Sequence, residues 1–186
     1  MDGETSQLSR PSADRQRSYD GGYMAVGKNG EEIVMAWIAN HPQTLGVDDV
    51  RELRVTRDAD IDCFIKTQDG RVTLAEIKTD QHLGVSGNVL FEVLRINHTA
   101  PPDRAVTLGW AARSPARTLF YYAPSVSAIY ICRFDALRLC FQKWSREARG
   151  KMRINVVPTD NIKTTVNVLI PWAAVSDIFQ IKRADG

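Results

Sequence analysis

Two short runs of alternating apolar and polar residues, joined by a turn, constrain the fold of this chain more than any other feature. They span residues 61–67 and 72–79, and Gln68-Asp69-Gly70 lies between them. A three-residue connection with glycine last is typical of a β-hairpin, because the third loop residue takes a positive φ. The sequence therefore predicts an antiparallel hairpin whose turn is centred on Asp69.

That register places two carboxylates opposite each other. Asp62 faces Glu76, and Lys78 projects to the same side as Glu76 because side chains alternate along a strand. Facing like charges destabilise a sheet unless a cation lies between them. A divalent metal ion held by Asp62 and Glu76, with the Ile77 carbonyl nearby, satisfies this condition. The alternative is an ordinary cross-strand ion pair between Asp60 and Lys78 on a solvated surface, and the charges alone do not decide between the two.

These residue types suit the hydrolysis of phosphodiester bonds. Carboxylates are the oxygen ligands that Mg²⁺ prefers, and a bound metal ion lowers the pKa of an attacking water. The ammonium of Lys78 would orient that water, help to deprotonate it, or offset the negative charge that develops at phosphorus.

The stretch ADIDCFIKTQDGRVTLAEIKTD resembles the active-site hairpin of the PD-(D/E)XK nuclease superfamily. There an Asp on one strand is followed by E-x-K on the next, as Asp62 is followed here by EIK at residues 76–78. The resemblance implies a restriction-endonuclease-like core of helix, three strands, helix and strand. It also implies a Mg²⁺- or Mn²⁺-dependent endonuclease that acts on DNA, related to resolvases or to restriction, phage or plasmid nucleases. RNA is an alternative substrate, and a homodimer stays open. The competing hypothesis is a nucleic-acid-binding or assembly protein that keeps this fold without cutting.

Many members of that superfamily supply a further glutamate from the first helix. Residues 27–42 carry apolar side chains at helical spacing, and the run ends at a proline. Glu31 follows Gly30 and shares a face with the apolar residues three, four and seven places further on. We therefore expect Glu31 to join the three charged residues of the hairpin as a catalytic residue. Glu32 lies off this stripe and is the second choice, and either could be an ordinary acidic residue at a helix start.

The remaining patterns predict an α/β (α+β) domain with a mixed sheet flanked by helices. Further strands are expected at residues 52–56, 117–123, 127–134, 152–157 and 162–170, and further helices at residues 88–98 and 135–150. Residues 1–22 are polar and nearly free of apolar side chains, so they cannot contribute to a core. We expect them to be a disordered arm ahead of one domain over residues 23–186.

Basic residues are concentrated in one segment, although the net charge of the chain is only +2. Between Arg133 and Arg153 there are seven Lys or Arg against two acidic residues. On the predicted helix at residues 135–150, four of these residues are expected to bind nucleic-acid phosphates: Arg138, Lys143, Arg146 and Arg149. A solvated helix face is the alternative explanation for the same charges.

Other sequence features exclude several classes of protein. The three cysteines are far apart and lie in apolar runs, which indicates reduced core residues and neither a disulfide frame nor a zinc site. No stretch reaches the length of a membrane span, and the N-terminus lacks the apolar segment of a signal peptide. These features predict a cytoplasmic protein without a membrane partner.

Overall fold

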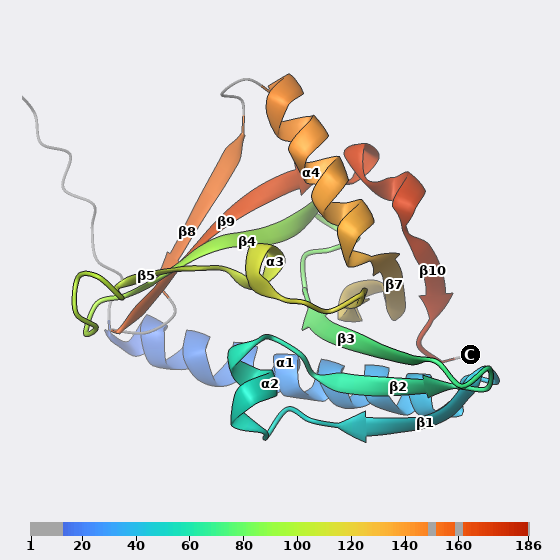
Figure 1. The fold of residues 1–186 in the computed structure, drawn as a ribbon. Helices are drawn as coiled ribbons and strands as arrows, with labels where there is room; N and C mark the ends of the chain where they lie inside the picture. The colour runs from blue at the N-terminus through green and yellow to red at the C-terminus, as the bar shows by residue number, and fades with distance from the viewer. Residues whose placement is uncertain (1–12, 149–151, 159–161, 186) are drawn as a thin grey trace, which may run out of the picture.

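A computed structural model describes residues 13–148, 152–158 and 162–185 of the chain (Figure 1). Its helices are α1 (Ala13–Asn40), α2 (Arg54–Asp58), α3 (Trp110–Arg113) and α4 (Phe134–Ala148), with short 3₁₀ turns η1 (Pro124–Val126), η2 (Trp172–Ala174) and η3 (Ser176–Ile178). Its strands are β1 (Thr44–Asp49), β2 (Cys63–Thr67), β3 (Val72–Thr79), β4 (Asn88–Asn97), β5 (Val106–Leu108), β6 (Thr118–Ala123), β7 (Ala128–Arg133), β8 (Arg153–Pro158), β9 (Lys163–Pro171) and β10 (Gln180–Arg183).

The strands form two sheets. The first has six strands in the order β1-β2-β3-β6-β7-β10, in which β3 and β6 are parallel and all other neighbours are antiparallel. The second has four antiparallel strands in the order β5-β4-β9-β8. Between β3 and β6 the chain leaves the first sheet, forms β4, β5 and α3, and then returns. The predicted α/β class with a mixed sheet flanked by helices is confirmed.

Helix α1 covers one face of the six-stranded sheet. Val34 and Ile38 on α1 are buried against a cluster that includes Ile77 of β3 and Phe120 of β6. In Figure 1, α1 runs beside β1, β2 and β3, and the four-stranded sheet extends away from them. Alternate residues of β3 therefore point toward α1 or away from it.

The opposite face of the six-stranded sheet packs against the second sheet, α3 and α4. Trp110 of α3 lies at the centre of this core, with ring contacts to Phe91 of β4, Tyr121 of β6 and Phe134 of α4. Leu137 of α4 is fully buried in the same cluster. The structure thus has two apolar cores, one on each face of the six-stranded sheet. The first core lies against α1, and the second lies against the four-stranded sheet, α3 and α4.

Most of the predicted elements are present, with shifts of a few residues at their ends. The structure confirms the strands expected within residues 61–67, 72–79, 117–123, 127–134, 152–157 and 162–170, and the helix expected at residues 135–150. The pattern did not reveal β1, β5 or β10. Strands β5 and β10 have only three and four residues, and β1 and β10 are edge strands of the first sheet.

The strand predicted at residues 52–56 is wrong. These residues form a turn and the start of α2, and the strand of this region is β1, at residues 44–49. Leu53 and Val55 suggested an alternating strand, but both are exposed, whereas Thr56 is buried. The Thr56 hydroxyl donates to the carbonyl of Leu53 at 2.9 Å, and this bond stabilises the helical turn.

The helix predicted at residues 88–98 is also wrong, because this segment is strand β4. Val89 and Phe91 alternate inward as a strand requires, but the register shifts between Glu92 and Leu94, where β4 carries a bulge opposite β9. The extra residue moves the apolar side chains from an alternating to a helix-like spacing. The partner strand β9 lies far along the chain, so local sequence does not reveal the pairing.

Helix α1 begins at Ala13, well before the predicted start near residue 27. The second half of the predicted disordered arm, residues 13–22, is therefore helical, while residues 1–12 lie outside the described residues. Apolar periodicity identifies only the part of a helix that packs on a core. None of the described helices is both long enough and apolar enough to cross a membrane.

Candidate active site

The β2–β3 hairpin has the predicted register. Cys63 faces Ala75 and Lys66 faces Val72, and the turn between the strands is closed by a hydrogen bond from the Gly70 N–H to the Thr67 carbonyl at 2.9 Å. Gly70 has a φ of 80°, the left-handed conformation that glycine adopts without strain. The sequence therefore predicted the geometry of this turn correctly.

Regular pairing in the hairpin ends at Asp62. The Asp62 N–H donates to the Ala75 carbonyl at 2.9 Å, while the next residue back, Ile61, donates its N–H to Thr56 instead of to β3. Asp60 has a φ of 52°, which turns the chain away from the sheet. The last residues of β3, from Glu76 to Thr79, therefore continue beyond the start of β2.

The side chain of Asp62 takes the place of the missing backbone partner. Its Oδ2 accepts a hydrogen bond from the N–H of Ile77 at 2.7 Å. Because the N–H and C=O of one strand residue point to the same side, the Ile77 carbonyl also points toward the side of β3 where Asp62 lies. Burial raises the pKa of Asp62, although the Lys78 charge and the Ile77 hydrogen bond act in the opposite direction.

Glu76 is fully buried on the face of β3 that points away from α1. In the parallel register it lies beside Leu119 of β6, which belongs to the second core. Its Oε1 forms an ion pair with Lys78 Nζ, and no other described residue donates a hydrogen bond to either carboxylate oxygen. Burial raises the pKa of Glu76 to about 8, and the negative charge of Asp62 adds to the shift against the opposing effect of Lys78.

Lys78 borders the second core. Its Nζ is 5.7 Å from the centre of the Trp110 ring, and 29% of its side chain is exposed. Burial favours the neutral amine, but the charges of Glu76 and Asp62 outweigh this effect and raise the pKa of Lys78. The amine is therefore held in its charged form, paired with Glu76 and within electrostatic range of Asp62.

The ordinary ion pair between Asp60 and Lys78, which was the alternative explanation, is not formed. Asp60 instead accepts a hydrogen bond from Arg113 Nε at 2.8 Å, and its carbonyl accepts one from the Ser114 hydroxyl at 2.6 Å. Asp60 therefore fixes the loop before β2 to the end of α3. Lys78 remains available to Glu76.

Glu31 approaches the same region from α1. Burial raises its pKa, and both Asp62 and Lys78 contribute electrostatically to the shift, so the three groups lie within interaction range. Glu31 Oε2 accepts a hydrogen bond from Arg51 at 2.9 Å. Glu32 is more exposed and contacts the same guanidinium at 3.0 Å. The structure thus associates Glu31 rather than Glu32 with the hairpin carboxylates.

Arg51 is a feature that the sequence analysis missed. Its guanidinium binds Asp49 at 2.5 Å in addition to Glu31 and Glu32, and only 17% of its side chain is exposed. A hollow of about 500 Å³ is lined here by Gly27, Lys28, Glu31, Glu32, Arg51 and Glu52. Arg51 follows β1, which the pattern did not reveal, and so no local signal placed it beside α1.

The described residues contain no group of three or more His, Cys, Asp or Glu side chains arranged to hold a metal ion. The groups near the hairpin that could hold a metal ion are the Asp62 and Glu76 carboxylates and the Ile77 carbonyl. The buried Glu76 oxygens, which have only an ammonium beside them, are the observation that fits a hard cation such as Mg²⁺ or Mn²⁺.

The basic residues predicted on α4 fall into different environments. Lys143 and Arg146 are exposed. Arg138 is half-buried, with its Nε donating to the Ala111 carbonyl at 2.9 Å and its guanidinium 4.6 Å from the centre of the Phe134 ring. Arg138 therefore joins α4 to α3, and this position differs from the free phosphate-binding face that was expected. Arg149 lies outside the described residues.

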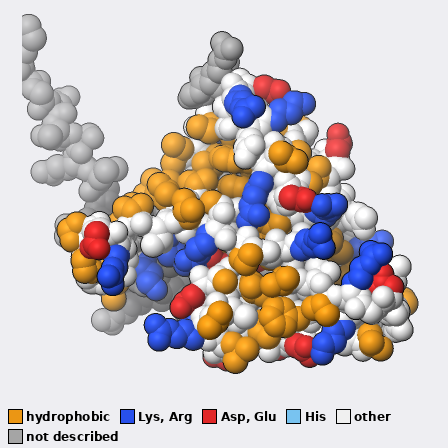
Figure 2. Space-filling model, in the orientation of Figure 1, with side chains coloured by type: hydrophobic (Ala, Val, Ile, Leu, Met, Phe, Trp, Pro, Cys, Tyr) orange, Lys and Arg blue, Asp and Glu red, His pale blue; other side chains and the backbone are white. Residues whose placement is uncertain are grey.

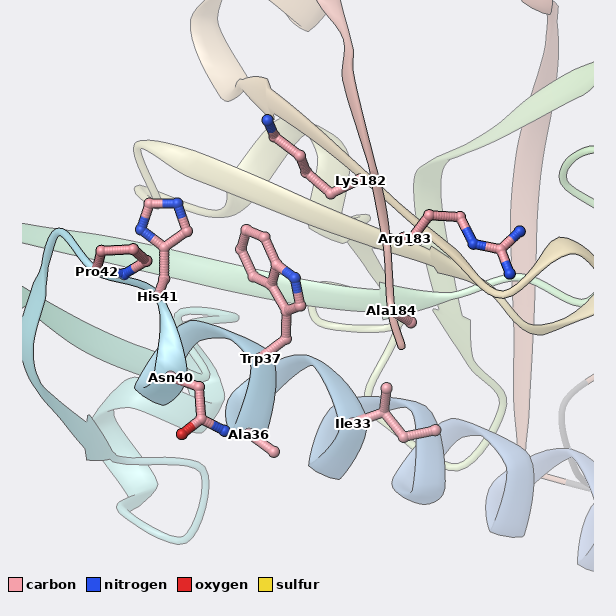
Figure 3. A pocket seen from close by; sticks show the side chains of 9 residues that line it. All are labelled: Ile33, Ala36, Trp37, Asn40, His41, Pro42, Lys182, Arg183 and Ala184. Atoms are coloured by element: carbon pink, nitrogen blue, oxygen red, sulfur yellow. The ribbon is translucent and has the colours of Figure 1, made fainter. Parts of the chain in front are cut away.

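A second hollow lies between the C-terminal half of α1 and strand β10 (Figure 3). It measures about 580 Å³ and is lined by Ile33, Ala36, Trp37, Asn40, His41, Pro42, Lys182, Arg183 and Ala184. The Trp37 ring points from α1 toward β10. The lining contains no carboxylate, so this hollow is separate from the charged residues of the hairpin.

Comparison of the chain with models of protein families, with curated proteins and with solved structures found no match. The functional argument therefore depends on the geometry of the chain itself.

Proposed function

We propose that this protein is a metal-dependent nuclease that hydrolyses phosphodiester bonds of DNA. The observation that carries the proposal is the fully buried Glu76 carboxylate, which lacks hydrogen-bond donors other than Lys78 and lies next to Asp62 at the end of a hairpin. A carboxylate is expensive to bury without donors, and Lys78 can offset only one of the two negative charges of Asp62 and Glu76, so a further partner of positive charge is expected. A divalent cation is such a partner, and it is the one that phosphodiester hydrolysis uses.

Each residue has a separate role in this proposal. Asp62, Glu76 and the Ile77 carbonyl would hold Mg²⁺ or Mn²⁺. When bound, the metal ion supplies a Lewis acid for the phosphate and lowers the pKa of the attacking water. Lys78 orients that water or stabilises the charge that develops at phosphorus. Glu31, held by Arg51, is the acid that α1 contributes.

We also propose that α1, β1, β2, β3 and β6 form a restriction-endonuclease-like core. The antiparallel order β1-β2-β3 followed by the parallel strand β6 supports this assignment, as does α1 on one face. The crossover from β3 to β6 differs from the expected single helix, because it contains β4, β5 and only the short helix α3. The three unpaired cysteines support the cytoplasmic location predicted from the sequence.

The competing function is a nucleic-acid-binding or assembly protein without catalysis. A cleavage assay separates the two. The full chain is incubated with supercoiled, linear, branched and single-stranded DNA and with RNA, in Mg²⁺, Mn²⁺ or a chelator. We expect cleavage of DNA that the chelator abolishes.

Two variants and two controls test the assignment of residues. Asp62→Asn and Glu76→Gln should abolish cleavage while the protein remains folded. Asp58→Asn on α2 and Glu147→Gln on α4 change exposed carboxylates of the same types and should cut normally. Binding of DNA by the wild type with no cleavage of any substrate would favour the competing function. Cleavage of RNA alone would replace DNA as the substrate.

A further inference from the structure

The lining of the hollow between the C-terminal half of α1 and β10 contains basic but no acidic residues. Its two basic residues are Lys182 and Arg183 of β10. Elsewhere acidic side chains usually accompany basic ones, and Figure 2 shows most acidic side chains of its face beside a lysine or arginine. Lys66 of β2, for example, pairs with Asp48 of β1 at 2.9 Å. The lining of the hollow therefore favours a ligand with negative charge.

The two basic residues of the lining point to different sides of the sheet. Lys182 faces Ile129 across the β10–β7 pair, and Ile129 is buried in the core against α1, so Lys182 projects to the α1 side. Arg183 projects to the other side and donates two hydrogen bonds to the Asp185 carboxylate, at 3.1 Å and 3.0 Å. Lys182 forms no ion pair with any residue in the described part of the chain. Its ammonium is therefore the charge that the hollow offers to a ligand.

Two rings at the end of α1 form another wall of the hollow. The ring centres of Trp37 and His41 are 5.2 Å apart, and Trp37 also contacts Phe120 of β6 at 6.4 Å. Trp37 is only half-buried, and its ring points toward β10 (Figure 3). Nδ1 of His41 accepts a hydrogen bond from the Gln43 N–H at 3.3 Å, so the neutral ring carries its proton on Nε2. The hollow therefore presents a flat apolar ring beside an N–H donor.

The end of α1 determines where in the hollow a negative charge is stable. The carbonyl groups of the last helical turn carry the negative end of the helix dipole, and this turn contains no basic residue. In Figure 3 the Lys182 side chain extends away from Asn40, the last residue of α1, so the lysine does not neutralise this helix end. An anionic group is therefore favoured beside Lys182 and disfavoured beside Asn40.

These features together fit a flat aromatic group that carries a phosphate. The volume of about 580 Å³ lies in the usual range of small-molecule sites, roughly 300–1,000 Å³. Nucleobases stack on exposed aromatic rings, and a lysine ammonium binds phosphate as a point charge. We propose that this hollow binds a nucleoside phosphate, with its base against Trp37 and its phosphate beside Lys182. The Nε2–H group of His41 is a further hydrogen-bond donor to this ligand.

This binding site is independent of the proposed cleavage. It shares no lining residue with the hairpin carboxylates, and it needs neither a metal ion nor a reaction. The nucleoside phosphate has two sources with the same chemistry: a free nucleotide, or one nucleotide of a single strand. A free nucleotide and an oligonucleotide of the same base therefore belong in the same experiment.

Isothermal titration calorimetry of the full chain in a chelator, which prevents cleavage, tests the proposal. Adenosine 5′-monophosphate should bind with a dissociation constant of about 1 mM or tighter. Adenosine lacks the phosphate and ribose 5-phosphate lacks the base, so each should bind about tenfold more weakly. An eight-residue oligodeoxyadenylate that binds more tightly than the monophosphate would identify the strand as the source of the ligand. The reverse order would identify the free nucleotide.

Two variants with matched controls locate the binding. Trp37→Leu should weaken binding of the monophosphate and of the oligonucleotide by about tenfold, because the stacking ring is lost. Trp144→Leu changes a half-buried tryptophan of α4 and should bind like the wild type.

The second variant remains informative if Trp37→Leu does not fold, because Lys182 is exposed on an edge strand. Lys182→Gln should weaken binding of the monophosphate by about fivefold and leave the binding of adenosine unchanged. Lys66→Gln on β2 should change neither. A wild type that binds neither the monophosphate nor the oligonucleotide would overturn the proposal. So would a folded Lys182→Gln variant that binds the monophosphate as tightly as the wild type.

Discussion

The Oδ2 atom of Asp62 accepts a 2.7 Å hydrogen bond from the backbone N–H of Ile77, at the point where β2 ends and β3 continues. In a longer hairpin this N–H would bond to a carbonyl of β2. The carboxylate therefore completes the edge of β3, and its other oxygen remains for a ligand. One side chain thus has a structural role and a chemical role, and substitutions can separate them.

Asp62→Ala should destabilise the protein more than Asp62→Asn. Alanine leaves the Ile77 N–H without an acceptor, whereas the amide oxygen of asparagine can still accept the bond. We expect the free energy of unfolding of Asp62→Ala to be lower than that of Asp62→Asn by about 1–2 kcal/mol. Urea unfolding without metal measures the difference. Equal stabilities would show that the hydrogen bond does not contribute.

Gly30→Ala should destabilise the packing of α1 on β3. A Cβ at Gly30 would lie 2.1 Å from Oγ1 of Thr79, so α1 or Thr79 must move. We expect a loss of about 1–3 kcal/mol, despite a gain in helix propensity of up to about 1 kcal/mol. Gly27→Ala is the control, because a Cβ there meets nothing within 4 Å, and it should be neutral or stabilising.

Removal of the obstructing side chain provides the second test of this contact. When Thr79→Ala is the background, adding Gly30→Ala should cost much less than it does in the wild type. Thermal melts of the wild type, the two single variants and the double variant give the coupling free energy between positions 30 and 79. An additive pair would mean that the close approach at Gly30 is not the cause of the destabilisation.

The parts of the fold that local sequence could predict are those that local geometry determines. The β2–β3 hairpin was predicted with its register because Gly70 fixes the turn, and α4 because its buried stripe is long and regular. Strand β4 could not be predicted in this way. Its bulge between Glu92 and Leu94 imitates helical spacing, and its partner β9 is distant in sequence.

The same reasoning explains which of the neighbouring charged residues could be predicted to lie together. Asp62, Glu76 and Lys78 are close in sequence or related by one hairpin, so alternation was enough to bring them together. Arg51 was missed because it meets Glu31 only through the packing of α1 on β1. The position of Arg138 also depends on a tertiary contact, with carbonyl groups at the end of α3. Side-chain type alone could not distinguish Arg138 from Lys143 or Arg146.

Arg138→Ala should lower stability, whereas the double variant Lys143→Ala/Arg146→Ala should change DNA binding and not stability. Arg138→Ala removes hydrogen bonds to buried carbonyls and should lower the free energy of unfolding by about 1–3 kcal/mol. The double variant changes exposed side chains and should leave stability nearly unchanged. If α4 contacts DNA, the double variant should reduce the slope of log affinity against log salt by about 0.9 per lost contact. Thermal melts and DNA binding at several salt concentrations measure both effects, and an unchanged salt slope would mean that DNA binds elsewhere.

Glu76→Gln and Lys78→Ala should separate metal binding from the chemical step. Glu76→Gln removes a ligand charge, so we expect it to lose both Mn²⁺ binding and cleavage. Its unfolding free energy without metal should change little, because the exposed part of Lys78 stays solvated and Asp62 remains beside it. Lys78→Ala leaves both carboxylates in place, so Mn²⁺ should still bind, while cleavage slows by about 10²-fold or more.

The two variants should also differ in how metal affects stability. Lys78 lowers the pKa of the buried Glu76, so without it the acid is protonated at neutral pH, and we expect metal-free Lys78→Ala to be less stable than the wild type, by about 1–3 kcal/mol, mainly at alkaline pH, where this proton is lost. Mn²⁺ supplies a counter-charge and should raise the melting temperature of Lys78→Ala at least as much as that of the wild type. Lys66→Ala, which changes an exposed lysine of β2, is the control and should behave like the wild type in all three measurements. Calorimetry with Mn²⁺, melts with and without metal, and single-turnover cleavage test these expectations together. Loss of Mn²⁺ binding in Lys78→Ala but not in Glu76→Gln would contradict the roles assigned to both residues.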